Sequence, residues 1–280
     1  MRLKAFLRLA RIEHSIFLAI AVVIGELVVT ERIELLPTLF GMLSVFFIGI
    51  ASFTINDFLD YNTDKKNKRK DRPLVNGSIS MWSAIVAAKI GFPLGILFSL
   101  FVNLECFVIA VIFSALAIAY SYHLKKLVLT GNLFIAFSMA IPLVYGNYIV
   151  SGNIDLAICL LALMAFLTGV GREIIKSVQD IKGDKASGRR TLPAAIGRKF
   201  SVYFAAYYVV LAIAISPVPF LTLPRFYGDW LYLAPVMVTD LMLLWSIYLS
   251  LALKELEKAR KISLGALGIG LIGFLLGALF

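Results

Sequence analysis

Three aspartates recur at helical spacing directly after the apolar segment 36–56. Asp57, Asp60 and Asp64 are spaced i, i+3, i+7, which at about 100° per residue places them within about 60° of one helix face. Carboxylates stacked in this way repel one another. A divalent cation reverses the sign of that energy, because Mg²⁺ prefers carboxylate oxygens and often shares them with substrate phosphates. The spacing therefore predicts a Mg²⁺ site, with a solvated acidic loop as the alternative.

A basic run follows the aspartates. Six Lys and Arg residues lie within the eight positions from Lys65 to Arg72. Such side chains hold phosphate oxygens through charge-assisted hydrogen bonds, and Lys68 and Arg72 are the candidate phosphate contacts here. The alternative is a loop that is basic only because Lys and Arg collect on the cytoplasmic side of membrane proteins.

A second acidic segment repeats the first. An offset of 120 residues aligns Asp60 with Asp180, Asp64 with Asp184, Pro73 with Pro193 and Gly77 with Gly197, and Ser177 takes the place of Asp57. Asp180 and Asp184 are about 40° apart on a helix, so they also share one face. A parallel repeat brings both acidic segments to the same side of a membrane. The aspartates of the two segments are therefore expected to converge on one cavity.

Charge balance indicates what that cavity binds. Five carboxylates in a partly desolvated volume require cations, and two Mg²⁺ ions would in turn leave room for a diphosphate and basic side chains. The available basic residues are Lys68, Arg72, Lys125, Lys126, Arg172, Lys176 and Arg190. The balance of these negative and positive charges predicts a metal–diphosphate substrate rather than a bare metal site.

The elements that position these residues are membrane helices. The chain has 280 residues, of which 60% are hydrophobic, and this composition excludes an ordinary soluble protein. The apolar segments predict nine transmembrane helices in an all-α bundle, at approximately 15–30, 36–56, 81–103, 105–122, 131–150, 156–175, 200–218, 231–253 and 263–279. The segment Met1–Arg11 carries basic residues at helical spacing, which is typical of an interfacial helix.

The distribution of charge predicts the orientation. With the N-terminus in the cytoplasm, all but three of the 27 Lys and Arg residues fall on the cytoplasmic side or at cytoplasmic helix ends. The net charge of +10 therefore follows from topology and a phosphate-binding face, and it does not indicate nucleic acid. We expect one membrane domain, 1–280, with a first repeat unit 1–122 (acidic segment 56–64), a second unit 123–253 (acidic segment 177–184) and a ninth helix in 254–280.

The Asn-Asp-x-x-Asp-x-x-x-Asp segment at 56–64, the second acidic segment at 180–184 and the nine spans resemble the UbiA-type intramembrane prenyltransferases over the whole chain. The resemblance implies a helical bundle with a central cavity and Mg²⁺-dependent transfer of a prenyl group from an isoprenyl diphosphate to a lipophilic acceptor in the bilayer. It implies that Asp57, Asp60, Asp64, Asp180 and Asp184 bridge the metals and are catalytic. The implied diphosphate contacts are Asn56, Arg72, Lys126, Lys176 and Arg190.

The family's Tyr-x-x-x-Lys pattern matches Tyr122 with Lys126, which makes Tyr122 a catalytic candidate. Tyr120 is two residues earlier, so the pattern leaves open which tyrosine faces the cavity. The sequence departs from the family pattern in two places, one in the second acidic segment and one in the first helix. Ser177 and Gln179 stand where acidic residues are often found, and His14 stands in place of an Asn.

Within the family, segment 171–184 most resembles the archaeal digeranylgeranylglyceryl phosphate synthases. These enzymes attach a second geranylgeranyl chain to geranylgeranylglyceryl phosphate in ether-lipid synthesis. An acceptor with its own phosphate needs further cationic contacts, for which Arg11, His14 and Lys4 are candidates. For Lys4 an attraction to anionic lipid headgroups is the alternative.

Two other functions fit parts of the pattern. Prenylation of an aromatic acceptor, as in quinone synthesis, would use the same fold and donor site. A repeat-built transporter would instead need charged or broken helices at mid-depth, whereas the acidic residues here cluster at one end of their helices.

Overall fold

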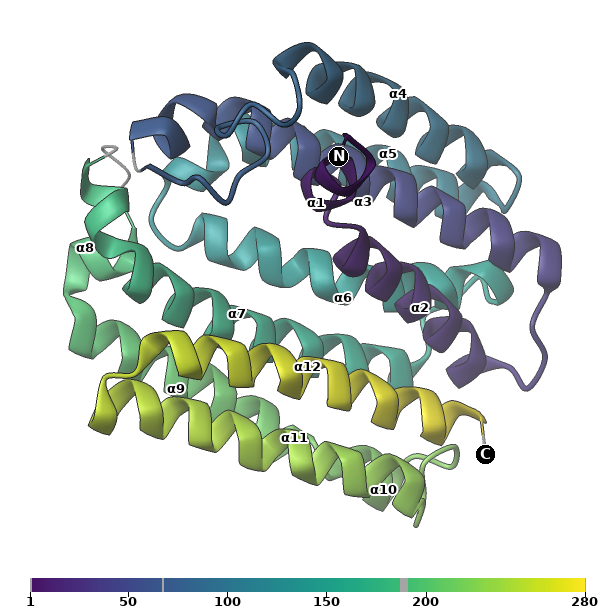
Figure 1. The fold of residues 1–280 in the computed structure, drawn as a ribbon. Coiled ribbons are helices and arrows are strands. Elements are labelled where there is room, and N and C mark those ends of the chain that lie inside the picture. Colours follow the sequence, from purple (N-terminus) through teal and green to yellow (C-terminus); the bar gives the residue numbers. More distant parts are fainter. Residues whose placement is uncertain (1, 67, 187–190, 280) are drawn as a thin grey trace.

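A computed structural model describes residues 2–66, 68–186 and 191–279 of the chain. Every regular element within these ranges is helical (Figure 1), which confirms the predicted all-α class. The helices are α1 (Arg2–Leu9), α2 (Ile12–Val29), α3 (Leu35–Lys66), α4 (Met81–Leu100), α5 (Leu104–Tyr122), η1 (Leu124–Lys126), α6 (Thr130–Val150), α7 (Leu156–Ala186), α8 (Leu192–Ile196), α9 (Arg198–Ile215), α10 (Val218–Thr222), α11 (Trp230–Tyr248), the π-helical turn η2 (Leu249–Leu253) and α12 (Leu256–Leu279).

Nine helices within the described ranges are long and apolar enough to cross a membrane, in agreement with the predicted number. Two of them extend well beyond their apolar segments. The helix α3 ends at Lys66 rather than near 56, and α7 ends at Ala186 rather than near 175. Their acidic segments therefore continue the helices instead of forming loops, which fixes the aspartates to rigid elements.

The bundle is arranged around α2 and α6. In Figure 1 these two helices lie between the group α3, α4 and α5 and the group α7, α9, α11 and α12. The contact between α2 and α6 is close because each presents a glycine to the other: a side chain at Gly25 would collide with the Leu143 carbonyl, and one at Gly146 with the Val22 carbonyl. Small residues that allow such backbone approach are typical of membrane helix pairs.

This contact gives a stability prediction. We expect Gly146→Ala to lower the free energy of unfolding by about 1–3 kcal/mol, because the added methyl meets backbone atoms that no rotamer change can move. Gly268→Ala is the matched control, since a methyl at this helical glycine of α12 meets no atom within 4 Å. Thermal unfolding in detergent measures both, and equal melting temperatures would contradict the prediction.

The first helix covers the loop between α3 and α4. Leu9 is fully buried against Leu74 of that loop and Ala84 of α4. This small core joins the N-terminal segment to the loop that follows the first acidic segment. It also brings Arg11, which has a left-handed backbone (φ 44°) between α1 and α2, close to the end of α3.

Candidate active site

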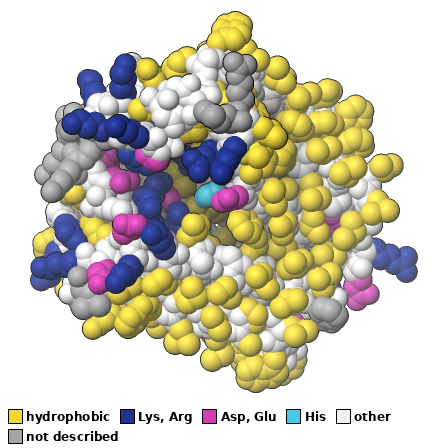
Figure 2. Space-filling view, in the orientation of Figure 1, with side chains coloured by type: hydrophobic (Ala, Val, Ile, Leu, Met, Phe, Trp, Pro, Cys, Tyr) yellow, Lys and Arg dark blue, Asp and Glu magenta, His cyan; other side chains and the backbone are white. Residues whose placement is uncertain are grey.

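One cavity of about 400 Å³ lies inside the bundle. Residues of α2, α3, α5, α6 and α7 line it, together with Arg69 and Arg72 of the α3–α4 loop. Acidic and basic side chains gather around the hollow in Figure 2, while much of the surrounding surface in that view is hydrophobic. The lining changes from charged residues to Leu18, Phe53, Phe113, Phe134 and Ile135. The cavity therefore combines an ionic region with an apolar one.

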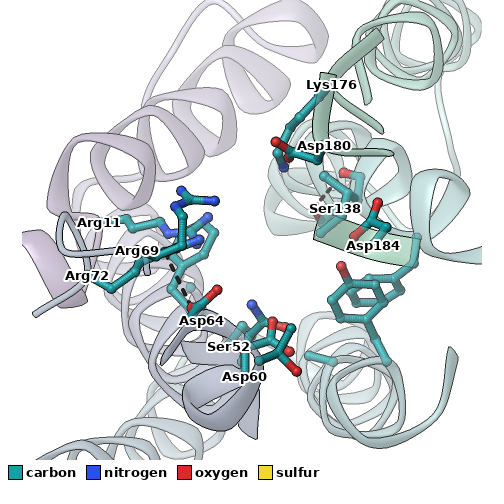
Figure 3. A pocket seen from close by; sticks show the side chains of 18 of the residues that line it. Arg11, Ser52, Asp60, Asp64, Arg69, Arg72, Ser138, Lys176, Asp180 and Asp184 are labelled. Atoms are coloured by element: carbon teal, nitrogen blue, oxygen red, sulfur yellow. Dashed lines mark hydrogen bonds and ion pairs between the residues drawn. The ribbon is translucent and has the colours of Figure 1, made fainter. Parts of the chain in front are cut away.

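Four of the five predicted aspartates meet at this cavity. Asp60 and Asp64 project from α3, and Asp180 and Asp184 project from α7 on the opposite side (Figure 3). They belong to helices that approach one another only through tertiary packing. The predicted convergence of the two acidic segments is thus present in the structure.

Basic side chains balance the acidic ones. The Lys125 Nζ atom lies 2.8 Å from Asp60 Oδ1 and donates a second hydrogen bond to Asn56. The Arg72 Nε atom lies 3.6 Å from Asp64 Oδ2. Among the residues that the structure describes, no three His, Cys, Asp or Glu side chains already form a metal-binding group. The carboxylates that line the cavity are of the type that Mg²⁺ prefers, since this cation commonly takes one or two carboxylates and completes its shell with phosphates and water.

Asp57 differs from the other four aspartates. It is 3% exposed, does not line the cavity and accepts hydrogen bonds from Arg11 and Arg72. The sequence spacing placed it on the acidic face, but the cavity lies on the neighbouring side of α3. Asp57 therefore belongs to the acidic motif but does not face the cavity with the other aspartates.

The cations at the cavity differ in part from those predicted. Arg11, Arg72 and Lys176 line it as expected, and Arg69 lines it as well, although the sequence analysis did not select it from the basic run. Arg69 donates two hydrogen bonds to Asp71, at 3.0 and 3.1 Å. This contact lowers the pKa of the Asp71 carboxyl, so the pair is charged near neutral pH.

A second ionic cluster lies on α7. Glu173 is buried and accepts hydrogen bonds from Arg172 Nη1 (2.6 Å) and Lys176 Nζ (2.9 Å). Arg172 is itself 8% exposed and does not line the cavity, whereas Lys176 does. His14 is half-buried, with its ring edge-on to Phe53. Sequence reasoning missed Glu173; its only signal was an acidic residue between two basic ones in an apolar helix.

Two of the predicted phosphate contacts do not line the cavity. Lys68 is exposed and Lys126 is exposed, and neither lines it. Lys125, also among the predicted basic residues, is the lysine that binds the acidic cluster, through its hydrogen bond to Asp60. Arg190 lies outside the described residues.

The structure also distinguishes the two tyrosines. Tyr120 lines the cavity and stacks on Phe134 with ring centroids 4.6 Å apart, and Phe134 stacks on Phe113 at 5.7 Å. Tyr122 is 46% exposed and does not line the cavity. The choice of Tyr122 as the catalytic tyrosine is therefore corrected: two residues along a helix rotate a side chain by about 200°, so only one of the pair can face inward.

This difference predicts unequal effects of substitution. We expect Tyr120→Ala to reduce about tenfold the prenyl transfer that the family resemblance implies, because it removes an aromatic face from the cavity lining. Tyr122→Ala, which truncates an exposed ring of the same helix, is expected to stay within about twofold of the parent. Initial rates of both proteins in detergent test this expectation, and a larger loss in the Tyr122 variant would contradict it.

Comparison with known proteins identifies the group to which this site belongs. The model of the UbiA prenyltransferase family matches residues 15–277. The chain belongs to the UbiA prenyltransferase family. It is a prenyltransferase and an integral membrane protein.

Within the family, the chain is similar along its whole length to several archaeal enzymes of one name. The chain is 40% identical to a digeranylgeranylglyceryl phosphate synthase of Archaeoglobus fulgidus, over 99% of this chain and 96% of that protein. It is 36% identical to the enzyme of the same name from Pyrococcus furiosus, over 100% and 99% of the two chains. A solved structure concerned with a digeranylgeranylglyceryl phosphate synthase in membranes covers 99% of both chains with a TM-score of 0.77 and 33% identity.

More distant UbiA structures share the fold. A UbiA homologue from Archaeoglobus fulgidus, solved with GPP and Mg²⁺ bound, matches with a TM-score of 0.72 at 20% identity, over 97% of this chain and 99% of that one. The helical bundle around the cavity is therefore the fold of this family.

Proposed function

We propose that the protein transfers a geranylgeranyl group from geranylgeranyl diphosphate to the hydroxyl of geranylgeranylglyceryl phosphate, in archaeal ether-lipid synthesis. The observation that carries this proposal is the meeting of Asp60 and Asp64 with Asp180 and Asp184 across a cavity that continues into an apolar, aromatic region. Full-length similarity to archaeal synthases of that name supports the acceptor.

The residues present fit Mg²⁺ as the cofactor. Asp60 and Asp64 on one side and Asp180 and Asp184 on the other supply carboxylate oxygens, the ligands that this cation prefers. Bound Mg²⁺ supplies charge stabilisation for a departing diphosphate. Asn56 lies in the same cavity and can donate to a phosphate oxygen through its amide.

The basic and aromatic side chains at the cavity stabilise the charges that develop during the reaction. Arg69, Arg72 and Lys125 place positive charge beside the acidic cluster, where a diphosphate gains negative charge as its bond to carbon breaks. The Tyr120 and Phe134 rings face the cavity and can stabilise an allylic cation. An acidic side chain or a diphosphate oxygen then accepts the proton of the attacking hydroxyl.

The apolar end of the cavity suits the prenyl chain. Phe53, Phe113, Phe134 and Ile135 lie there. Burying methylene groups against such residues is worth about 0.8 kcal/mol each, so donor and acceptor are expected to enter from the bilayer.

The acceptor phosphate needs cations beyond those around the donor. Arg11, at the junction of α1 and α2, and Lys176 of α7 line the cavity, and Lys176 shares the buried Glu173 carboxylate with Arg172. Lys176 and Arg172 are the cations that we assign to the acceptor phosphate, and Arg11 lies at the same cavity. The basic loops and the N-terminus face the cytoplasm, as the charge distribution predicts.

An acceptor screen tests the function. Purified protein in detergent or lipid vesicles, supplied with geranylgeranyl diphosphate and Mg²⁺, is expected to prenylate geranylgeranylglyceryl phosphate, with the product identified by mass spectrometry. An aromatic acid such as 4-hydroxybenzoate serves as the competing acceptor. Turnover with the aromatic acid alone would replace the ether-lipid function with quinone-type prenylation.

A further inference from the structure

Asp57 is buried in the C-terminal part of α3 and is bound by two arginines. Arg72 Nη1 donates to both of its carboxylate oxygens, at 2.9 and 3.0 Å, and Arg11 Nη2 donates to Oδ1 at 3.1 Å. The side chain of Asp57 is 4% exposed, compared with 26% for Arg11 and 23% for Arg72. The carboxylate is thus enclosed, while both arginine side chains remain partly exposed.

The geometry of α3 explains why Asp57 does not face the cavity. Seven residues of this helix line the cavity: Gly49, Ser52, Phe53, Asn56, Asp60, Thr63 and Asp64. At about 100° per residue they cover an arc of about 120°, and Asp57 falls about 20° beyond its edge, on the side of Asp64. On that side it meets the arginines instead of the cavity.

The two arginines come from separate segments of the chain. Arg11 lies at the junction of α1 and α2, where it also stacks over the Phe53 ring with its Cζ atom 4.9 Å from the centroid. Arg72 lies in the α3–α4 loop, which α1 covers through the contact of Leu9 with Leu74. Two guanidinium groups that converge in this way repel one another, and a shared buried carboxylate offsets the repulsion and fixes both orientations.

We propose that Asp57 is a positioning residue that holds Arg11 and Arg72 as a clamp for a substrate phosphate, rather than a ligand of the metal. This inference rests on the proposed function. Both arginines line the cavity, and within the described residues their hydrogen bonds to Asp57 use only one Nη atom of each. Arg72 Nε faces Asp64 at 3.6 Å, so Arg72 Nη2 and Arg11 Nη1 are the groups that we assign to the phosphate oxygens. The phosphate belongs to the donor diphosphate or to the acceptor.

Comparing Asp57→Asn with Asp60→Asn separates positioning from metal binding. We expect Asp57→Asn to bind Mn²⁺ as the parent does, measured by electron paramagnetic resonance on the substrate-free protein. Its affinity for inorganic pyrophosphate or for glycerol 1-phosphate, measured by calorimetry, is expected to fall about tenfold, since one charge-assisted contact is worth about that factor. Asp60→Asn, on the cavity face of the same helix, is expected to weaken Mn²⁺ binding.

Steady-state kinetics identify the source of the phosphate. A raised KM for geranylgeranyl diphosphate alone assigns the clamp to the donor, and a raised KM for geranylgeranylglyceryl phosphate alone assigns it to the acceptor. Because the binding measurements need no turnover, they test the clamp even if the parent protein fails to prenylate either lipid. That failure would count against the proposed function and not against the clamp.

Arg11→Gln tests the same clamp in a second variant, so the test does not depend on how well the Asp57 variant folds. It is expected to reproduce the lost phosphate affinity at unchanged Mn²⁺ affinity. In the double variant with Asp57→Asn the two losses should overlap rather than add, because both remove the same contact. Weakened Mn²⁺ binding in Asp57→Asn, or phosphate affinities and KM values unchanged in Arg11→Gln, would overturn the proposal.

Discussion

Asp60→Ala and Asp180→Ala are each expected to reduce kcat/KM for prenyl transfer by at least about 100-fold. Each aspartate comes from a different acidic segment, and the two face the same cavity from α3 and α7. Removing either one takes away a carboxylate that the proposed Mg²⁺ site requires, and electrostatic stabilisation of this kind is typically worth about 100- to 1,000-fold per group. Initial rates at saturating Mg²⁺ measure the effect.

A matched carboxylate controls for general loss of charge. Glu257 lies on α12 with its side chain 64% exposed and paired with Lys261, so Glu257→Ala should leave the rate within about twofold of the parent. All three proteins should elute as monodisperse species with similar melting temperatures. Full activity in both aspartate variants would refute the proposed site, and loss in only one would restrict the metal to one side of the cavity.

Lys125→Met is expected to lower kcat/KM by about 10- to 100-fold. Its side chain is 7% exposed, and its ammonium group lies 2.8 Å from Asp60 and donates a second hydrogen bond to Asn56. A buried charge-assisted contact of this kind is worth about 1.5–3 kcal/mol. The variant also leaves the carboxylate of Asp60 without this partner, so we expect the change to raise the KM for the diphosphate donor.

The adjacent lysine is the control for this prediction. Lys126 carries the same charge in the same short helix, but its side chain is exposed, whereas Lys125 is paired with Asp60. Lys126→Met should therefore change the kinetics by no more than about twofold. A greater loss in Lys126→Met than in Lys125→Met would restore the pairing that the family's Tyr-x-x-x-Lys pattern suggests.

Much of the architecture was accessible from the sequence because it depends on properties that are local in the chain. Runs of about twenty apolar residues define spans whatever their partners are, and the nine predicted helices are present in the described structure. The acidic segments were recognisable because i, i+3, i+4 spacing places side chains on one face of a single helix. The family resemblance used the same local features, and the comparisons confirm it.

The rotation of each helix within the bundle was not accessible in this way. A helical pattern defines which residues share a face, but not which neighbour that face meets. Asp57 lies only about 20° from Asp64 around α3, yet one contacts two arginines and the other lines the cavity. Tyr120 and Tyr122, and Lys125 and Lys126, differ for the same reason.

The sequence by itself determined the membrane class, the helix number, the two acidic segments and the chemistry that they favour. The tertiary structure decided which charged side chains reach the common cavity, and it added Arg69 and the buried Glu173 to the site. The physical reason is that hydrophobic runs and helical periodicity are encoded within single segments. The direction of each face depends on close contacts between segments, such as that of α2 with α6 at Gly25 and Gly146.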